Sequence, residues 1–132
     1  MINFKNKTAF LGLVCVLALG ACTSKPIFNV TDAPVTTVSG KAAQAAQVRT
    51  AIIAAGSALG WQIVETSPGN LQGTLSLRTH TAIVDIPYSA TKYSIQYKSG
   101  VNLAEKDGQI HKNYNGWIQN LDAKIRVELA RL

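Results

Sequence analysis

Three consecutive runs in which apolar and polar residues alternate constrain the fold of this chain most strongly. They are LQGTLSLR (residues 71–78), TAIVDI (81–86) and KYSIQYK (92–98). Alternation with a period of two places apolar side chains on one face of a strand and polar ones on the other. Antiparallel sheets commonly have one solvent-exposed face. The run WQIVET (61–66), ended by the turn signal SPGN, is expected to add a fourth strand, and the short connections favour a meander.

Apolar residues at helical spacing flank these strands on both sides. One helix is expected within residues 41–60, with an N-cap at Ser39 and a C-cap at Gly60. Its apolar face is formed by Val48, Ile52, Ala55 and Leu59. Gly56 inside this helix lowers the stability of the helix, unless the glycine is needed for a close approach to a sheet. A second helix is expected from Lys112 to Leu132. Its apolar face is formed by Tyr114, Ile118, Leu121, Ile125 and Leu129.

The order helix, four strands, helix predicts a single α+β domain over residues 41–132. Because one sheet face and one stripe of each helix are apolar, we expect a two-layer sandwich. Both helices would pack on one face of a four-stranded antiparallel meander. The chain has 132 residues, of which 47% are hydrophobic, which is enough for one core.

The first 21 residues are typical of an export signal. Lys5 and Lys7 precede an uncharged apolar run of 13 residues, from Ala9 to Ala21. A membrane-spanning helix needs about 20 apolar residues, whereas the core of a signal peptide is shorter. We therefore expect residues 1–21 to be a signal peptide.

The end of this run, Leu19-Gly20-Ala21-Cys22, resembles the lipobox of bacterial lipoproteins. The resemblance implies thioether acylation of Cys22 with fatty acids such as palmitate, and cleavage after Ala21. Two or three acyl chains hold a protein stably on a membrane. Because Thr23 and not aspartate follows, the resemblance favours the outer membrane of a Gram-negative bacterium, with the domain in the periplasm or outside the cell. The alternative is an ordinary secretory signal or an N-terminal anchor helix, in which Cys22 is only a small apolar residue.

Residues 22–40 are expected to form the lipidated N-terminus and an extended tether. The stretch is rich in threonine, serine and proline and has no helical period. Ile27, Phe28 and Val30 could instead dock on the domain as an edge segment.

The charge of the mature chain suits anionic partners. The formal net charge of the whole chain is +6, and without residues 1–21 it falls to +4, because 11 basic and 7 acidic residues remain. Such a value suits anionic lipid head groups or polyanionic envelope polymers such as glycans. The basic residues form no run, so we expect no nucleic-acid partner.

Few residues of the domain are suited to catalysis or metal binding. His80 and His111 are its only histidines, and with Asp85 they would form a minimal metal site if their segments met. The alternative is ordinary surface or hydrogen-bonded histidines, with a cross-strand partner such as Lys98 or Arg78 for Asp85. We expect no catalytic residue, no bound metal and no cofactor.

The segment IHKNYNGWIQNL (residues 110–121) holds the densest cluster of unusual residues. Asn113, Asn115 and Gly116 are poor helix-interior residues, so we expect them to cap the second helix or bind it to the sheet or a partner. Tyr114 and Trp117 are amphipathic aromatics of the kind enriched in binding sites, or else core residues hydrogen-bonded at one end. The candidate binding residues are therefore His80, Asp85, His111, Asn113, Tyr114 and Trp117.

Four segments together resemble a group of small, uncharacterised proteobacterial lipoproteins: GWQIVETSPGNLQGTL, HTAIVDIPYS, KYSIQYKSGVNL and IHKNYNGWIQNL. The resemblance spans residues 52–129 and carries no activity. The sequence favours a membrane-anchored, non-catalytic binding or envelope-assembly module, with an envelope protein, a glycan or anionic lipid as partner. The alternatives are a small envelope enzyme or metal-binding protein using His80, His111 and Asp85, and a lipoprotein with a purely structural role.

Overall fold

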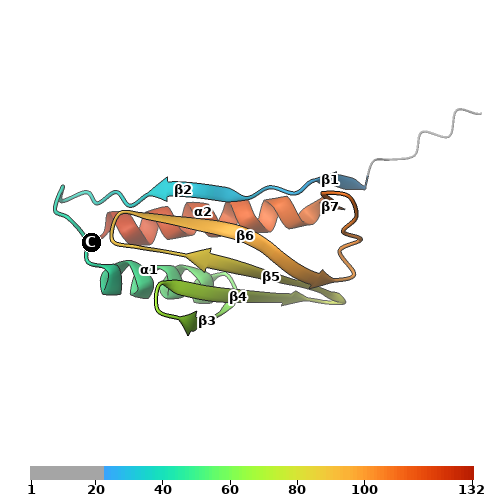
Figure 1. The fold of residues 1–132 in the computed structure, drawn as a ribbon, viewed down its shortest axis with the longest axis horizontal. Coiled ribbons are helices and arrows are strands. Elements are labelled where there is room, and N and C mark those ends of the chain that lie inside the picture. The colour runs from blue at the N-terminus through green and yellow to red at the C-terminus, as the bar shows by residue number, and fades with distance from the viewer. Residues whose placement is uncertain (1–22) are drawn as a thin grey trace, which may run out of the picture.

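The computed structural model describes residues 23–132, so the expected signal peptide, Ala21 and Cys22 lie outside the described residues. The elements in chain order are β1 (Ser24–Pro26), β2 (Val30–Pro34), α1 (Ala45–Ala58), β3 (Gln62–Ser67), β4 (Asn70–Leu77), β5 (His80–Pro87), β6 (Lys92–Val101), β7 (Gln109–His111) and α2 (Asn113–Ala130). Strands β2 to β6 form an antiparallel sheet of order β2-β6-β5-β4-β3, and β1 pairs with β7 in a second sheet. Both helices lie on one side of the five-stranded sheet (Figure 1). The predicted α+β class is confirmed.

The predicted four-stranded meander is present as β3 to β6, but it is only part of the sheet. Strand β2 adds a fifth strand beside β6, and β1 pairs with β7. Both β1 and β2 lie within residues 22–40, the stretch expected to be a tether. The tether prediction, and with it a domain beginning at residue 41, is therefore wrong for residues 24–34. The structure shows the alternative, in which this stretch docks on the domain.

Burial of two small apolar side chains explains why β2 docks. Val30 and Ala33 are only 7% and 4% exposed, so pairing with β6 removes their side chains from water. Before the strand, Asn29 Oδ1 accepts the backbone N–H of Tyr97 at 2.9 Å, which fixes the approach to β6. The segment is thus held by the core and by hydrogen bonds.

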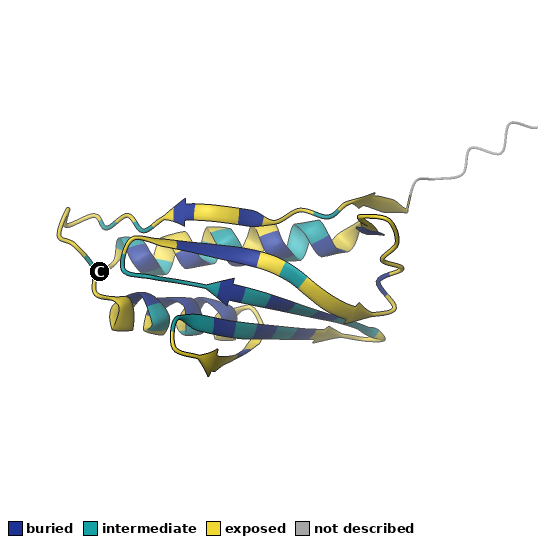
Figure 2. Cartoon of the chain, in the orientation of Figure 1, coloured by how far each residue is buried: buried dark blue, intermediate teal, exposed yellow. Residues whose placement is uncertain are grey.

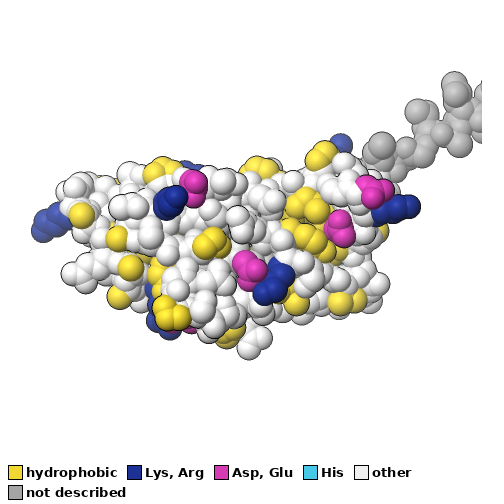
Figure 3. Space-filling model, in the orientation of Figure 1, with side chains coloured by type: hydrophobic (Ala, Val, Ile, Leu, Met, Phe, Trp, Pro, Cys, Tyr) yellow, Lys and Arg dark blue, Asp and Glu magenta, His cyan; other side chains and the backbone are white. Residues whose placement is uncertain are grey.

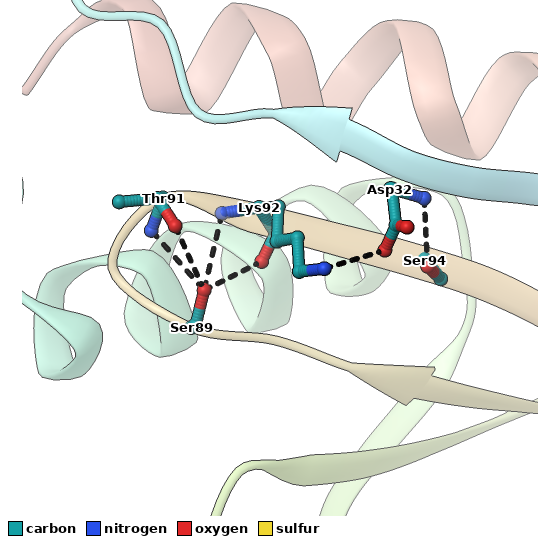
Figure 4. Close-up of polar contacts among 5 residues, drawn as sticks. All are labelled: Asp32, Ser89, Thr91, Lys92 and Ser94. Carbon is teal, nitrogen blue, oxygen red and sulfur yellow. Dashed lines mark hydrogen bonds and ion pairs between the residues drawn. The ribbon is translucent and has the colours of Figure 1, made fainter.

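A bulge in β2 is held by a polar cluster at the β5–β6 turn (Figure 4). The register with β6 shifts between Val30 and Ala33, and Asp32 in the shift has a φ of 49°. The backbone N–H of Asp32 donates to Ser94 Oγ (2.9 Å), and its carboxylate pairs with Lys92 (3.1 Å). Alternation predicts Ser94 on the solvent-exposed face of the sheet. It is only 5% exposed, however, because its hydroxyl accepts the hydrogen bond from the bulge.

The hydrophobic core lies between the five-stranded sheet and the helices (Figure 2). From the sheet, Leu71, Val84 and Ile95 are fully buried. The apolar face predicted for the second helix is confirmed by α2, whose buried residues are Tyr114, Ile118, Leu121, Ile125 and Leu129. The hydroxyl of Tyr93 donates to Asp122 Oδ1 at 2.5 Å, which ties β6 to α2.

Helix α1 begins later than predicted, and its C-cap is Leu59, one residue before the predicted Gly60. Gln44, not Ser39, is the N-cap, and its backbone N–H donates to the side-chain carbonyl of Gln47 at 2.9 Å. Gly60 has a φ of 84°, so it ends the helix in the left-handed region that glycine adopts readily. A Cβ atom on Gly56 would overlap Ile63 of β3, so this glycine does permit a close approach to the sheet.

Candidate functional site

One end of the molecule brings together most of the candidate binding residues. It comprises residues 23–28, 77–81 and 101–117, which include β1, the β4–β5 turn, the loop after β6, β7 and the start of α2. We term it the β1–β7 end. Figure 1 shows these segments together where the described chain begins, whereas the β3–β4 and β5–β6 turns and the C-terminus lie at the opposite end.

His80 and His111 meet at the β1–β7 end, together with Trp117. The centroids of the two imidazole rings are 5.2 Å apart, and the centroid of the Trp117 ring lies 6.4 Å from that of His80. His80 shares one face of β5 with the buried Ala82 and Val84, so its ring points towards the helix layer. Strand β7 places His111 directly before α2, and all three aromatic side chains are partly buried.

Backbone partners orient both imidazole rings. Nδ1 of His80 lies 2.9 Å from the carbonyl oxygen of Asn102, which only accepts, so Nδ1 donates, and the lone pair of the neutral ring is on Nε2. Nδ1 of His111 accepts the backbone N–H of Asn113 at 3.3 Å, so the proton of the neutral ring is on Nε2. The side-chain amide of Asn102 also donates to the carbonyl of Thr79 at 2.7 Å. Asn102 therefore joins the β4–β5 turn to the end of β6.

An apolar hollow borders this aromatic cluster. It has a volume of about 180 Å³ and is lined by Leu59, Trp61, Leu75, Leu77, Trp117 and Asn120. Alternation and helical spacing predict inward positions for Leu77 and Leu59, yet they are 43% and 38% exposed. Both are terminal residues: Leu77 is the last of β4, and Leu59 is the C-cap of α1. Small-molecule pockets usually exceed about 300 Å³, so this hollow is the size of a single side chain.

The two asparagines at the start of α2 have different roles. Asn113 contributes its backbone N–H to His111. Asn115 binds β1 with its side chain: Oδ1 accepts the N–H of Phe28 (3.0 Å), and Nδ2 donates to the carbonyl of Pro26 (2.8 Å). The sequence predicts that these asparagines cap the second helix or bind it to the sheet or a partner. The N-cap of α2 is Lys112, without a side-chain cap bond, and Asn115 instead holds the backbone around β1, a strand that the sequence pattern did not predict.

Tyr114 belongs to the core and not to the surface of the β1–β7 end. It is fully buried, and its ring makes an edge-on contact with Tyr97, with centroids 5.3 Å apart. Its hydroxyl has no hydrogen-bond partner among the described residues. Burial raises the pKa of this hydroxyl above its ordinary value.

Asp85 lies apart from the two histidines. Five residues of extended strand separate it from His80, about 17 Å along β5, and the two side chains project from opposite faces. Asp85 Oδ1 pairs with Lys98 Nζ at 3.2 Å, the cross-strand partner named above, and Lys98 also donates to Gln72. Neither histidine is visible on this open sheet face in Figure 3. Within residues 23–132 no group of three or more His, Cys, Asp or Glu side chains is placed to hold a metal ion.

Comparisons with protein-family models, with curated proteins and with solved structures each found no match. Within the described part of the chain, no helix is long and apolar enough to cross a membrane.

Proposed function

We propose that the chain is a lipid-anchored protein of the bacterial outer membrane, and that its folded domain is a non-catalytic binding or envelope-assembly module. One observation carries this proposal. Strand β1 begins at Ser24, two residues after the lipobox cysteine, and β1 belongs to the end that gathers His80, His111 and Trp117. Acylation of Cys22 would therefore hold these side chains at the membrane surface.

The anchor is tested with labelled palmitate in cells that make the wild type, Cys22→Ser or Cys15→Ser. Cys15 is the matched control, because it lies in the same apolar run but outside the lipobox. We expect the wild type and Cys15→Ser to incorporate label equally, and Cys22→Ser to incorporate none. Equal labelling of Cys22→Ser would remove the basis for the anchor.

The binding role is tested with Trp117→Ala in the acylated protein. Trp117 is partly buried and borders the hollow, so its removal changes the surface of this end. We expect the variant to retain its membrane location and lose the envelope component that cross-links to the wild type in intact cells. Thr50→Ala, an exposed change on α1, is the control. Identical cross-links for all three proteins would count against binding at this end.

A second candidate function, metal binding by the histidine pair, is favoured by the 5.2 Å between the ring centroids. Two imidazoles at this spacing could share one Zn²⁺ or Cu²⁺ ion, with water completing the coordination, if the hydrogen bond from the Asn113 N–H to Nδ1 of His111 (3.3 Å) opens and frees a lone pair on that ring. Asp85 is no longer part of this candidate. The test is calorimetric titration of the purified protein with each metal. Binding of one ion that is lost in His80→Ala and in His111→Ala, and kept in Asp85→Asn, would support it, whereas unchanged binding in the histidine variants would exclude it.

A further inference from the structure

The short distance between Cys22 and the folded domain limits how the domain can sit on a membrane. Two residues of extended chain span only about 7 Å, which is similar to the depth of one lipid head-group layer. Ser24 is paired with His111, and the N–H of Lys112 donates to the carbonyl of Thr23 at 2.8 Å, so both residues are held to the domain. If Cys22 is acylated, as the proposed function requires, the β1–β7 end must lie at the membrane surface.

The charged side chains of this end differ from those of the rest of the domain. Four exposed cations lie there: Lys25, Arg78, Lys106 and Lys112. None of them takes part in the six ion pairs found within residues 23–132, all of which join residues outside this end. Of the other described cations, Lys41 alone is outside an ion pair. Unpaired cations remain available to an external anion.

Two carboxylates, Glu105 and Asp107, share the β1–β7 end and reduce its excess charge. Four cations and two carboxylates leave a net charge of +2 before either histidine is protonated. The described remainder has seven cations and five acids, also +2, but six of those cations are already in ion pairs. The availability of the cations, and not the total charge, therefore distinguishes this end.

Exposed apolar side chains accompany the cations. Val101 is 57% exposed and Leu77 is 43% exposed, and both flank the β4–β5 turn, because Leu77 pairs with His80 and Val101 with Thr81. Trp117, at the border of the hollow, is an aromatic of the type that prefers the boundary between lipid and water. Cations, an indole and apolar groups at one end match the layered chemistry of a lipid surface.

We propose that the β1–β7 end docks directly on anionic phospholipid. Lys25, Lys106 and Lys112 would contact lipid phosphates, while Leu77 and Val101 enter the head-group layer. This inference rests on the proposed acylation of Cys22 and names the partner of that end. It also directs the β3–β4 turn, the β5–β6 turn and the C-terminus away from the membrane, because they lie at the far end of the molecule (Figure 1).

The test uses the full acylated protein in vesicles, with one fluorescent label at Thr79→Cys or Ala42→Cys. Both positions are exposed. Thr79 is at the β1–β7 end, whereas Ala42 follows Lys41 in a segment whose Ser39 hydroxyl donates to the carbonyl of the C-terminal Leu132, at the opposite end. The vesicles are phosphatidylcholine alone, or equal parts phosphatidylcholine and phosphatidylglycerol, and contain a head-group quencher. We expect several-fold stronger quenching at residue 79 than at residue 42, and a further increase with phosphatidylglycerol.

A charge series identifies the cations responsible. One cation near an anionic surface contributes a factor of about five to a binding equilibrium, so Lys25→Gln/Lys106→Gln should lower the ratio of docked to undocked protein by more than tenfold. The matched control is Lys41→Gln/Lys92→Gln, which removes the same charge from outside this end. Thermal unfolding of each variant verifies the fold.

The outcomes separate the anchor from the docking. If the protein fails to float with phosphatidylcholine vesicles, the anchor proposal fails and the docking inference fails with it. The docking inference alone is overturned if the protein floats but both labels are quenched equally. It is also overturned if quenching at residue 79 does not increase with phosphatidylglycerol. An equal response of the two charge variants would overturn it as well.

Discussion

Two buried tyrosines on facing elements differ in whether the hydroxyl has a partner. The hydroxyl of Tyr93 donates to Asp122, whereas that of Tyr114 is buried without a partner among the described residues. We expect Tyr114→Phe to raise the free energy of unfolding by about 1 kcal/mol, because an unpaired buried hydroxyl is costly. Tyr93→Phe should lower it by about 1–3 kcal/mol, since Asp122 loses a partner. Urea unfolding of both variants measures the two changes, and a change of the same sign in both would contradict this account.

The same two hydroxyls predict how stability responds to alkaline pH. Burial raises the pKa of Tyr114, and burial followed by the hydrogen bond to Asp122 raises the pKa of Tyr93, both from an ordinary value of 10.0. Above pH 10 the unfolded chain therefore releases protons that the folded chain retains. The stability contributed by the neutral hydroxyls is complete below pH 10 and is lost as the pH rises further. Urea unfolding between pH 8 and 11 should show this loss, with a smaller slope in Tyr114→Phe; an equal slope would show that Tyr114 ionises normally.

Two glycines near the β1–β7 end respond oppositely to the same change. A Cβ atom on Gly100 would lie 2.7 Å from the carbonyl oxygen of Thr81, whereas one on Gly116 would have no neighbour within 4 Å. We expect Gly100→Ala to destabilise the protein by about 1–3 kcal/mol, because the backbone of β5 must move. Gly116→Ala should stabilise it by about 0.5–1 kcal/mol through helix propensity. Thermal unfolding compares them, and a stable Gly100→Ala variant would disprove the close approach.

Side-chain periodicity predicts where a residue points better than what its polar atoms contact. The spacing of α2 correctly places Tyr114 on the buried face, but nothing in that spacing indicates that its hydroxyl lacks a partner. Likewise, alternation in KYSIQYK places Ser94 outward, and only the bulge at Asp32 accounts for its burial. Such contacts depend on segments far away in the sequence.

Elements with a sustained period were predictable, and short elements were not. Strands β3 to β6 and helix α2 follow periods of two and 3.6, and they occur close to their predicted residues. Strands β1 and β7 have three residues each, too few for a period, and they exist because they pair with one another. Strand β2 includes a bulge that breaks its alternation, so the sequence indicated only that its apolar residues could dock.

Asn115 links α2 to the segment around β1 through its side chain. Its side chain makes two hydrogen bonds to the backbone around β1, to Phe28 and Pro26. We expect Asn115→Ala to cost about 1–2 kcal/mol and to speed hydrogen exchange at Ile27 and Phe28, because both bonds are lost. Asn113→Ala is the control, since the Asn113 side chain forms no hydrogen bond within the described residues. Equal exchange in the two variants would show that pairing with β7 alone holds β1.

At the scale of the whole molecule, the fold has two chemically different ends. Pairing of β1 with β7 brings the start of the described chain to the end that contains His80, His111 and Trp117. The sequence singled out these three residues, but their meeting depends on the unpredicted strand β7. It also grouped Asp85 with them, although five residues of strand and opposite sheet faces separate Asp85 from His80. Candidate residues were thus predictable by type, while their grouping required the topology.

The most direct test of the account is the mass of the N-terminal peptide of the protein purified from bacterial membranes. Only Thr23 separates Cys22 from β1, so acylation at Cys22 determines which end of the domain meets the membrane. We predict a peptide that begins at Cys22 and carries a diacylglycerol thioether, with or without a further acyl chain on the amine. An intact bond between Ala21 and Cys22, or a mature chain with an unmodified Cys22 thiol, would contradict both the anchor and the orientation derived from it.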